Sequence, residues 1–99
     1  MLQTSNLRFA QVEDGEVIGF VKQSEAGDNA VAVAIALTSI PREFWFHFGE
    51  IEVGPPGNRR HVKSIENLIT GERRVLEWGG VRLRIDPQPD PVLLFRCFS

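Results

Sequence analysis

The sequence contains a single cysteine, Cys97, among its 99 residues. One cysteine cannot form an intrachain disulfide, and it cannot assemble a thiolate metal cluster. Cys97 lies in an apolar run, between Phe95 and Phe98. A cysteine in such a run is typical of a small core residue, so we expect it to be buried and not nucleophilic.

Long hydrophobic runs and concentrated positive charge are also missing. The longest apolar run, residues 30–37, is too short to span a bilayer, and residues 1–8 lack the apolar region of a secretory signal. The formal net charge is −2, and the basic residues are scattered among acidic ones. From these features we expect no membrane partner, no nucleic-acid partner and, by default, a cytoplasmic location.

Few residues could carry catalysis or hold a metal. His47 and His61 are the only histidines, and they lack the i, i+4 spacing of a helical metal pair. His47 could join Glu50 or Glu52 in a zinc or general-base site, but a surface or hydrogen-bonded histidine is the simpler interpretation. Glu50 and Glu52 share a strand face, whereas a glycosidase pair needs opposed carboxylates in a cleft. We therefore predict no catalytic residue, no metal and no cofactor.

Nucleotide-binding and nucleophile motifs are absent as well. The chain has no G-x-S-x-G sequence, no phosphate loop and no dinucleotide fingerprint. The glycine-rich stretch 54–57 contains two prolines, which lack the N–H donors that a phosphate cradle requires. This stretch is instead typical of a surface loop.

Short apolar runs separated by turn residues fill the chain. Residues 7–12 and 17–22 flank Asp14 and Gly15. An Asp-Gly pair between two apolar runs indicates a hairpin with a type I′ turn, which needs positive φ at both central residues. In this interpretation residues 7–12 and 17–22 are the two strands of that hairpin.

The second half of the chain repeats this pattern. Turn residues at 70–71 and 79–80 precede apolar segments, and the segment 81–85 alternates apolar with basic residues. The proline-rich stretch 86–91 is stiff and leads into a final apolar strand at 92–98.

The alanine-rich run at 30–37 alternates small with large apolar side chains. Val31, Val33, Ile35 and Leu37 share one face, and the alanines share the other. A helix is the alternative, but a period of 2 and a short length favour a strand. Because both faces are apolar, we expect a central strand that is covered on both sides.

Together these segments predict an all-β protein with a single domain spanning residues 1–99. About seven or eight short strands, with turn signals every 8–12 residues, are typical of an antiparallel β-sandwich or barrel. We expect a two-sheet antiparallel Greek-key β-sandwich.

Two tryptophans are the candidate ligand-binding residues. Three phenylalanines alternate with Trp45 and a histidine over residues 44–48, so Trp45 points outward if the phenylalanines fill the core. Trp78 precedes a Gly-Gly turn. An exposed tryptophan can stack on a sugar ring, which makes Trp45 and Trp78 candidate carbohydrate-binding residues. The alternative is that Trp78 caps one end of the core and Trp45 packs against a neighbouring domain.

Ordered motifs along almost the whole chain match a known pattern. In the first half they lie at 6–9, 17–22 and 27–33. In the second half they are N-L-I-T-G-E at 67–72, W-G-G at 78–80, V-R-L at 81–83, D-P at 86–87 and L-F-R at 94–96. In this order the motifs resemble the C-terminal domain of the α-1,4-glucan:maltose-1-phosphate maltosyltransferases, which belong to the α-amylase superfamily.

The resemblance implies a non-catalytic C-terminal accessory domain of a glycosyl hydrolase or maltosyltransferase of α-glucan metabolism. Such enzymes carry their catalytic residues in a (β/α)₈ barrel, and nothing in this chain corresponds to that barrel. We therefore expect one sheet face to pack on the barrel and stabilise it. The alternatives are an α-glucan-binding module that uses Trp45 or Trp78, and an independent small protein with its own partner.

Overall fold

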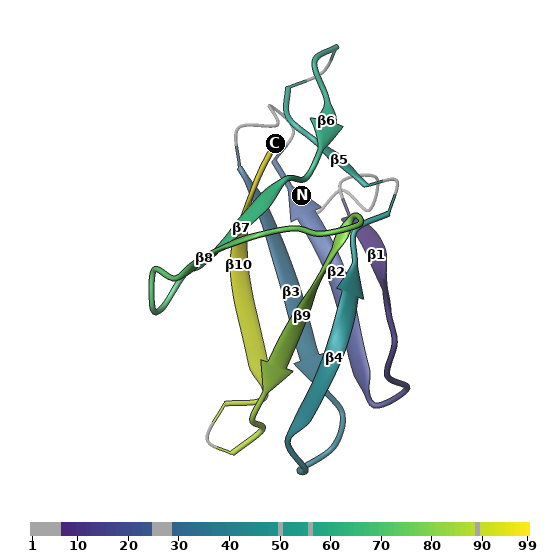
Figure 1. The fold of residues 1–99 in the computed structure, drawn as a ribbon, viewed down its shortest axis with the longest axis vertical. Helices are drawn as coiled ribbons and strands as arrows, with labels where there is room; N and C mark the ends of the chain where they lie inside the picture. Colours follow the sequence, from purple (N-terminus) through teal and green to yellow (C-terminus); the bar gives the residue numbers. More distant parts are fainter. Residues whose placement is uncertain (1–6, 25–28, 50, 56, 89) are drawn as a thin grey trace.

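The computed structural model describes residues 7–24, 29–49, 51–55, 57–88 and 90–99, which form β-strands and no helix (Figure 1). The strands are β1 (Leu7–Val12), β2 (Val17–Gln23), β3 (Ala30–Ala36), β4 (Arg42–His47), β5 (Glu52–Val53), β6 (Arg60–His61), β7 (Ser64–Asn67), β8 (Arg73–Val75), β9 (Gly80–Ile85) and β10 (Val92–Phe98). The all-β prediction is therefore confirmed. Eight strands are hydrogen-bonded side by side in one continuous series, which we call the ladder, and β5 and β6 form a separate two-stranded sheet.

The ladder has the order β8-β7-β10-β3-β2-β1-β4-β9, and all its described pairs are antiparallel. Within it, β4 returns to lie beside β1 after the meander of β1, β2 and β3. This spatial order, 4-1-2-3, is the Greek-key arrangement that the sequence predicted.

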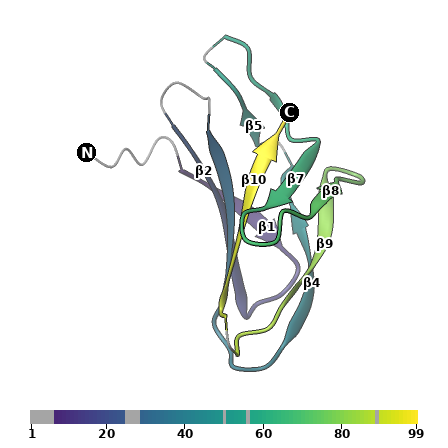
Figure 2. The same ribbon diagram turned by 90° about the vertical axis from the view of Figure 1, so that its left-hand side faces the viewer.

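Strand β1 belongs to two layers because it changes partner along its length. Residues from Leu7 to Ala10 pair with β2, whereas Gln11 and Val12 pair with β4. The ladder folds over at this change. It gives a large sheet (β8, β7, β10, β3, β2 and the start of β1) that faces a small sheet (the end of β1, β4 and β9), as Figure 2 shows.

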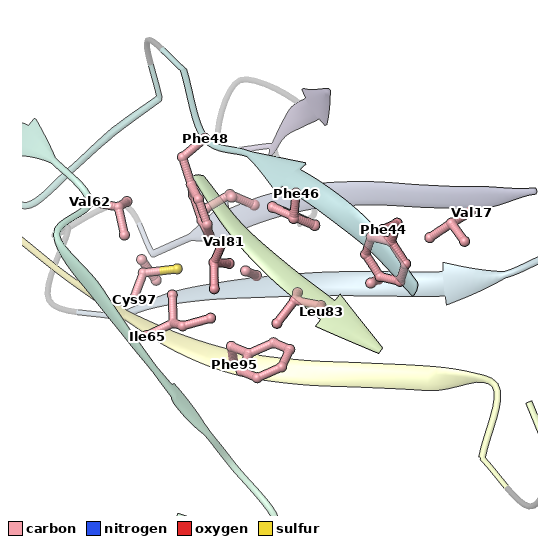
Figure 3. Close-up of a cluster of buried hydrophobic side chains, with 14 of the residues drawn as sticks. Val17, Phe44, Phe46, Phe48, Val62, Ile65, Val81, Leu83, Phe95 and Cys97 are labelled. Carbon is pink, nitrogen blue, oxygen red and sulfur yellow. The ribbon is translucent and has the colours of Figure 1, made fainter. Parts of the chain in front are cut away.

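The core lies between the two sheets. Phe44, Phe46 and Phe48 project from β4 and the residue after it toward the large sheet, and they are 1–3% exposed (Figure 3). Val81, Leu83 and Ile85 of β9 are buried beside them. The predicted inward faces of both segments are confirmed. The large sheet contributes Val17, Val21, Ile65, Phe95 and Cys97.

Strand β3 turns its small side chains to the core. Ala30, Ala32 and Ala34 are 1–5% exposed, whereas the β-branched side chains between them point outward and are half-buried. The predicted central strand is confirmed, since β3 lies between β10 and β2, and the helical alternative is wrong. The expected cover on both sides is not found among the described residues. Large phenylalanines on the facing sheet leave room only for alanine and glycine here.

The turn at Asp14 and Gly15 differs from the predicted type I′ hairpin. Neither residue has positive φ. The Oδ1 atom of Asp14 accepts a hydrogen bond from the Glu16 amide at 2.8 Å, and the Asp14 carbonyl accepts one from the Val17 amide at 3.3 Å. The pairing of β1 with β2 ends at Ala10, so the connection is longer than the two residues that a type I′ hairpin requires.

Replacing Gly19 by alanine tests how tightly the two sheets pack. A Cβ atom at Gly19 would lie 2.5 Å from Cε2 of Phe46 and 2.7 Å from Cγ2 of Val12. We expect Gly19→Ala to lower the free energy of unfolding by about 1–3 kcal/mol in urea denaturation, because overpacking forces side chains off their rotamers.

Gly15→Ala is the matched control, because a Cβ atom at Gly15 meets nothing within 4 Å. We expect this variant to change the free energy of unfolding by less than about 0.5 kcal/mol. Equal effects of the two substitutions would contradict the described packing of the sheets.

Candidate functional site

The outer face of the large sheet carries apolar side chains in register. Side chains alternate along a strand, so residues next to the core positions point outward, and directly paired residues share a face. The pairing therefore gives three outward rows across β1, β2, β3 and β10. These rows are Leu7, Lys22, Val31 and Arg96; Phe9, Phe20, Val33 and Leu94; and Ile18, Ile35 and Val92.

We call the apolar members of these rows the outer apolar face. Phe9 is 71% exposed and Ile18 is 39% exposed, while the other members are half-buried against one another. The rings of Phe9 and Phe20 meet edge to face, with centroids 6.3 Å apart. No element of the described chain covers this face. Contiguous apolar surface that is open to solvent is typical of interaction sites.

Charged side chains border the outer apolar face. Arg96 donates a hydrogen bond from Nη2 to the Asn29 side chain at 2.8 Å. Nη2 of Arg73 lies 3.8 Å from Oε2 of Glu66. The guanidinium group of Arg73 stacks over the Phe98 ring, with its Cζ atom 4.4 Å from the ring centroid. An apolar centre with a polar rim is the usual anatomy of a protein interface.

Trp45 lies on the outer face of the small sheet, as its alternation with the phenylalanines indicates. Its indole covers Gly80, where a Cβ atom would clash with Nε1, and its ring centroid is 5.8 Å from that of His47. Trp45 is half-buried and lines a hollow of about 220 Å³ with residues of β8 and β9. Contacts within its own domain therefore cover much of this side chain.

Trp78 projects from the tip of the hairpin that joins β8 to β9. It is 96% exposed, so the alternative that it caps the core is wrong. Trp78 and Gly79 have φ values of 56° and 74° and form the centre of a two-residue turn. Glu77 and Gly80 flank this turn and exchange backbone hydrogen bonds of 2.8 and 3.0 Å. The turn therefore lies one residue earlier than the predicted Gly-Gly pair, and it has the type I′ signs of φ.

The structure does not bring the two tryptophans together in one hollow. Trp78 is not among the residues that line the hollow beside Trp45. A left-handed backbone is also unusual for a bulky residue such as Trp78. Strain of this kind amounts to about 1 kcal/mol or more.

His47 contacts a glutamate other than the two suggested by the sequence. Its Nε2 atom lies 3.2 Å from Oε1 of Glu13. Glu50 lies outside the described residues, while Glu52 shares with His47 the lining of a hollow of about 630 Å³. Arg8 and Arg59 also line this hollow. Sequence reasoning missed the hollow because its residues come from segments far apart in the chain.

The described ranges contain neither a metal-binding cluster nor a membrane-spanning helix. No three or more His, Cys, Asp and Glu side chains there are grouped so that they could hold a metal ion. No helix in the same ranges is long and apolar enough to cross a membrane.

No family model matches the chain, and no curated protein matches it significantly. The likeness to the maltosyltransferase domain is therefore carried by the quoted motifs alone.

Cys97 is a core residue, as its apolar neighbours predicted. It is 7% exposed. Burial raises the pKa of the Cys97 thiol to about 12, and a hydrogen bond with the backbone of Ala32 offsets only part of this rise. A thiol with such a pKa is protonated at neutral pH and does not act as a nucleophile.

The buried thiol predicts a pH dependence of stability. The ordinary pKa is 9.0 and burial raises it, so the folded state favours the protonated thiol. This contribution is fully present below pH 9 and is lost as the pH rises toward 12. Above pH 9 we expect the free energy of unfolding to fall by up to about 1.4 kcal/mol per pH unit.

Urea denaturation between pH 8 and 11 measures this effect, and the chain contains no tyrosine to titrate in that range. The matched variant is Cys97→Ala, which should be less stable than the native chain near pH 8 but should lack most of the dependence. Parallel pH profiles for the two proteins would disprove the assignment to Cys97.

Proposed function

We propose that the chain is a non-catalytic accessory domain that docks on a larger protein through the outer apolar face. The partner that we propose is the catalytic (β/α)₈ barrel of an α-amylase superfamily enzyme of α-glucan metabolism, a glycosyl hydrolase or a maltosyltransferase. The observation that carries the docking proposal is the set of apolar rows on the large sheet, which no described element covers.

A sheet that is apolar on both faces needs a layer on each side. The large sheet buries its inner face against the small sheet, while its outer face has no such partner within the described chain. Burying the Phe9 side chain alone would contribute about 2 kcal/mol, and the neighbouring side chains would add to it. Rigid aromatic residues such as Phe9 and Phe20 are enriched among interface hot spots.

The choice of partner is supported by the motifs at 67–72, 78–80 and 81–83 and by their order. The N-L-I-T-G-E segment forms the turn between β7 and β8, where Oδ1 of Asn67 accepts hydrogen bonds from the Ile69 and Thr70 amides at 2.8 and 3.0 Å. The W-G-G segment forms the next turn, between β8 and β9. The first two motifs thus occupy consecutive turns, and the V-R-L motif lies in β9.

A second candidate function, α-glucan binding, is favoured by the position of Trp78. Its indole is almost fully exposed at the hairpin tip. A flat aromatic face can stack on a glucose ring without ordering many rotatable bonds. Trp45 offers less free surface, because it packs over Gly80 and beside His47.

Phe9→Asp tests docking through the outer apolar face. The partner is a maltosyltransferase from which the C-terminal domain has been deleted, and sedimentation measures its binding to the 99-residue chain. We expect the native chain to bind, and we expect Phe9→Asp to weaken binding at least tenfold, since it places a charge in the apolar contact.

Ile69→Asp is the control, because Ile69 is 73% exposed but lies in the turn between β7 and β8 and does not belong to the rows of the outer apolar face. The proposal fails if the two variants bind alike, or if the isolated chain hydrolyses or transfers glucan. Reading the coding sequence upstream of Met1 is an independent check, since the proposal expects an in-frame barrel there.

Maltoheptaose titration tests the second function. Binding at the hairpin tip should shift the tryptophan fluorescence of the native chain and the backbone amide signals of residues 77–80 in NMR spectra. Trp78→Ala should abolish these changes, whereas Trp45→Phe should retain them. The absence of any change up to millimolar ligand would reject glucan binding by this domain.

A further inference from the structure

Strand β9 is an edge strand of the small sheet and pairs on one side with β4. The Trp45 carbonyl accepts a hydrogen bond from the Glu13 amide at 3.1 Å, so the Trp45 backbone faces β1. Trp45 and its partner Arg82 therefore exchange no hydrogen bonds. By the same alternation, Arg82 and Arg84 turn their backbone N–H and C=O groups toward the free side of β9.

Strands β8 and β9 diverge after the turn that joins them. We call the gap between them, along the free side of β9, the seam. Glu77 and Gly80 pair next to the turn, but β8 then pairs with β7, where Arg74 lies opposite Ile65. Across the seam, Nη2 of Arg74 donates a hydrogen bond to the Arg82 carbonyl at 3.1 Å. A side chain thus occupies a position that the N–H group of a paired strand would take.

The seam contains space with an apolar floor. Buried or half-buried Leu83, Leu93 and Phe95 contribute to a hollow of about 210 Å³, and Arg74 and Arg84 contribute to its walls. A second hollow of about 260 Å³ also includes Arg74 and Arg84, together with Arg82. An exposed strand edge above apolar side chains is the arrangement that binds an extended peptide as an added strand.

The charged side chains along the seam indicate which kind of peptide fits it. Oε1 of Glu43 lies 2.5 Å from Nε of Arg82, whereas Arg84 has no carboxylate partner within the described chain. Glu72 and Glu77 also line hollows along the seam. However, the exposed side chains of β9 that would lie directly opposite the residues of an added strand are those of Arg82 and Arg84. A second copy of β9 would bring Arg82 and Arg84 opposite like charges, which is unfavourable.

We propose that the free edge of β9 binds an extended acidic segment of a partner protein as an additional strand of the small sheet. Backbone groups of Arg82 and Arg84 form the ladder, and their guanidinium groups face the acidic side chains of the added strand. Its other side chains contact the floor of the seam. This site is separate from the outer apolar face and does not depend on the proposed docking to a barrel.

NMR titration of the 99-residue chain tests the site directly. The probe is an acetylated, amidated six-residue peptide that alternates valine with glutamate, and a second peptide carries lysine in place of glutamate. We expect the glutamate peptide to shift the amide signals of Arg82 and Arg84 and to slow the hydrogen exchange of their amides. The lysine peptide should bind at least tenfold more weakly, because it faces the same arginines.

Variants separate this site from other surfaces. Arg84→Glu should weaken binding of the glutamate peptide at least tenfold, and Arg84→Gln should have a smaller effect. Arg60→Glu changes an exposed arginine on β6, outside the seam, and should leave binding unchanged, as should Phe9→Asp on the outer apolar face. Equal binding of both peptides, shifts confined to other residues, or no shift at millimolar peptide would overturn the proposal.

Discussion

The contact of Phe46 with Gly19 sets the distance between the two sheets, and the rest of the structure depends on it. The small sheet fills the core with phenylalanine, so the facing strands can carry only glycine and alanine at the matching positions. Val17 and Val21 of β2 stay in the core, but Ile18 and Phe20 of β2 and the larger side chains of β3 are left on the opposite side of the large sheet. The outer apolar face is thus a direct consequence of how the core is filled.

The double pairing of β1 explains why the sandwich is closed on one side and open on the other. Gln11 and Val12 leave β2 for β4, so a continuous ladder joins the two sheets at β1. At the other end of the ladder, β8 stays with β7 while β9 stays with β4. Within the described ranges, the hydrogen bonds that bridge β8 and β9 involve only Glu77, Gly80, the side chain of Arg74 and the Arg82 carbonyl, which leaves the β9 edge accessible.

The sequence predicts the strands and the Greek-key fold class well, because alternation and turn residues act locally. It identifies the inward face over residues 44–48, where large apolar residues alternate with more polar ones. It does not identify the inward face of β3, because both faces are apolar and the choice depends on the volume of the facing side chains. Nor does it place the type I′ turn, since Asp14–Gly15 has the preferred residues but lies where β1 has already changed partner. The seam and the hollow beside His47 escape prediction because they join distant segments.

Two neighbouring glycines explain how Trp78 reaches solvent. Gly79 takes the second left-handed position of the turn, and Gly80 leaves room for the Trp45 indole. A turn held in this way needs no tryptophan at its first central position, where asparagine or glycine would relieve the strain. The exposed side chain also buries almost no surface in the described structure. Folding of the described residues therefore gives no reason for tryptophan at position 78, which agrees with the proposal that its indole stacks on a ligand.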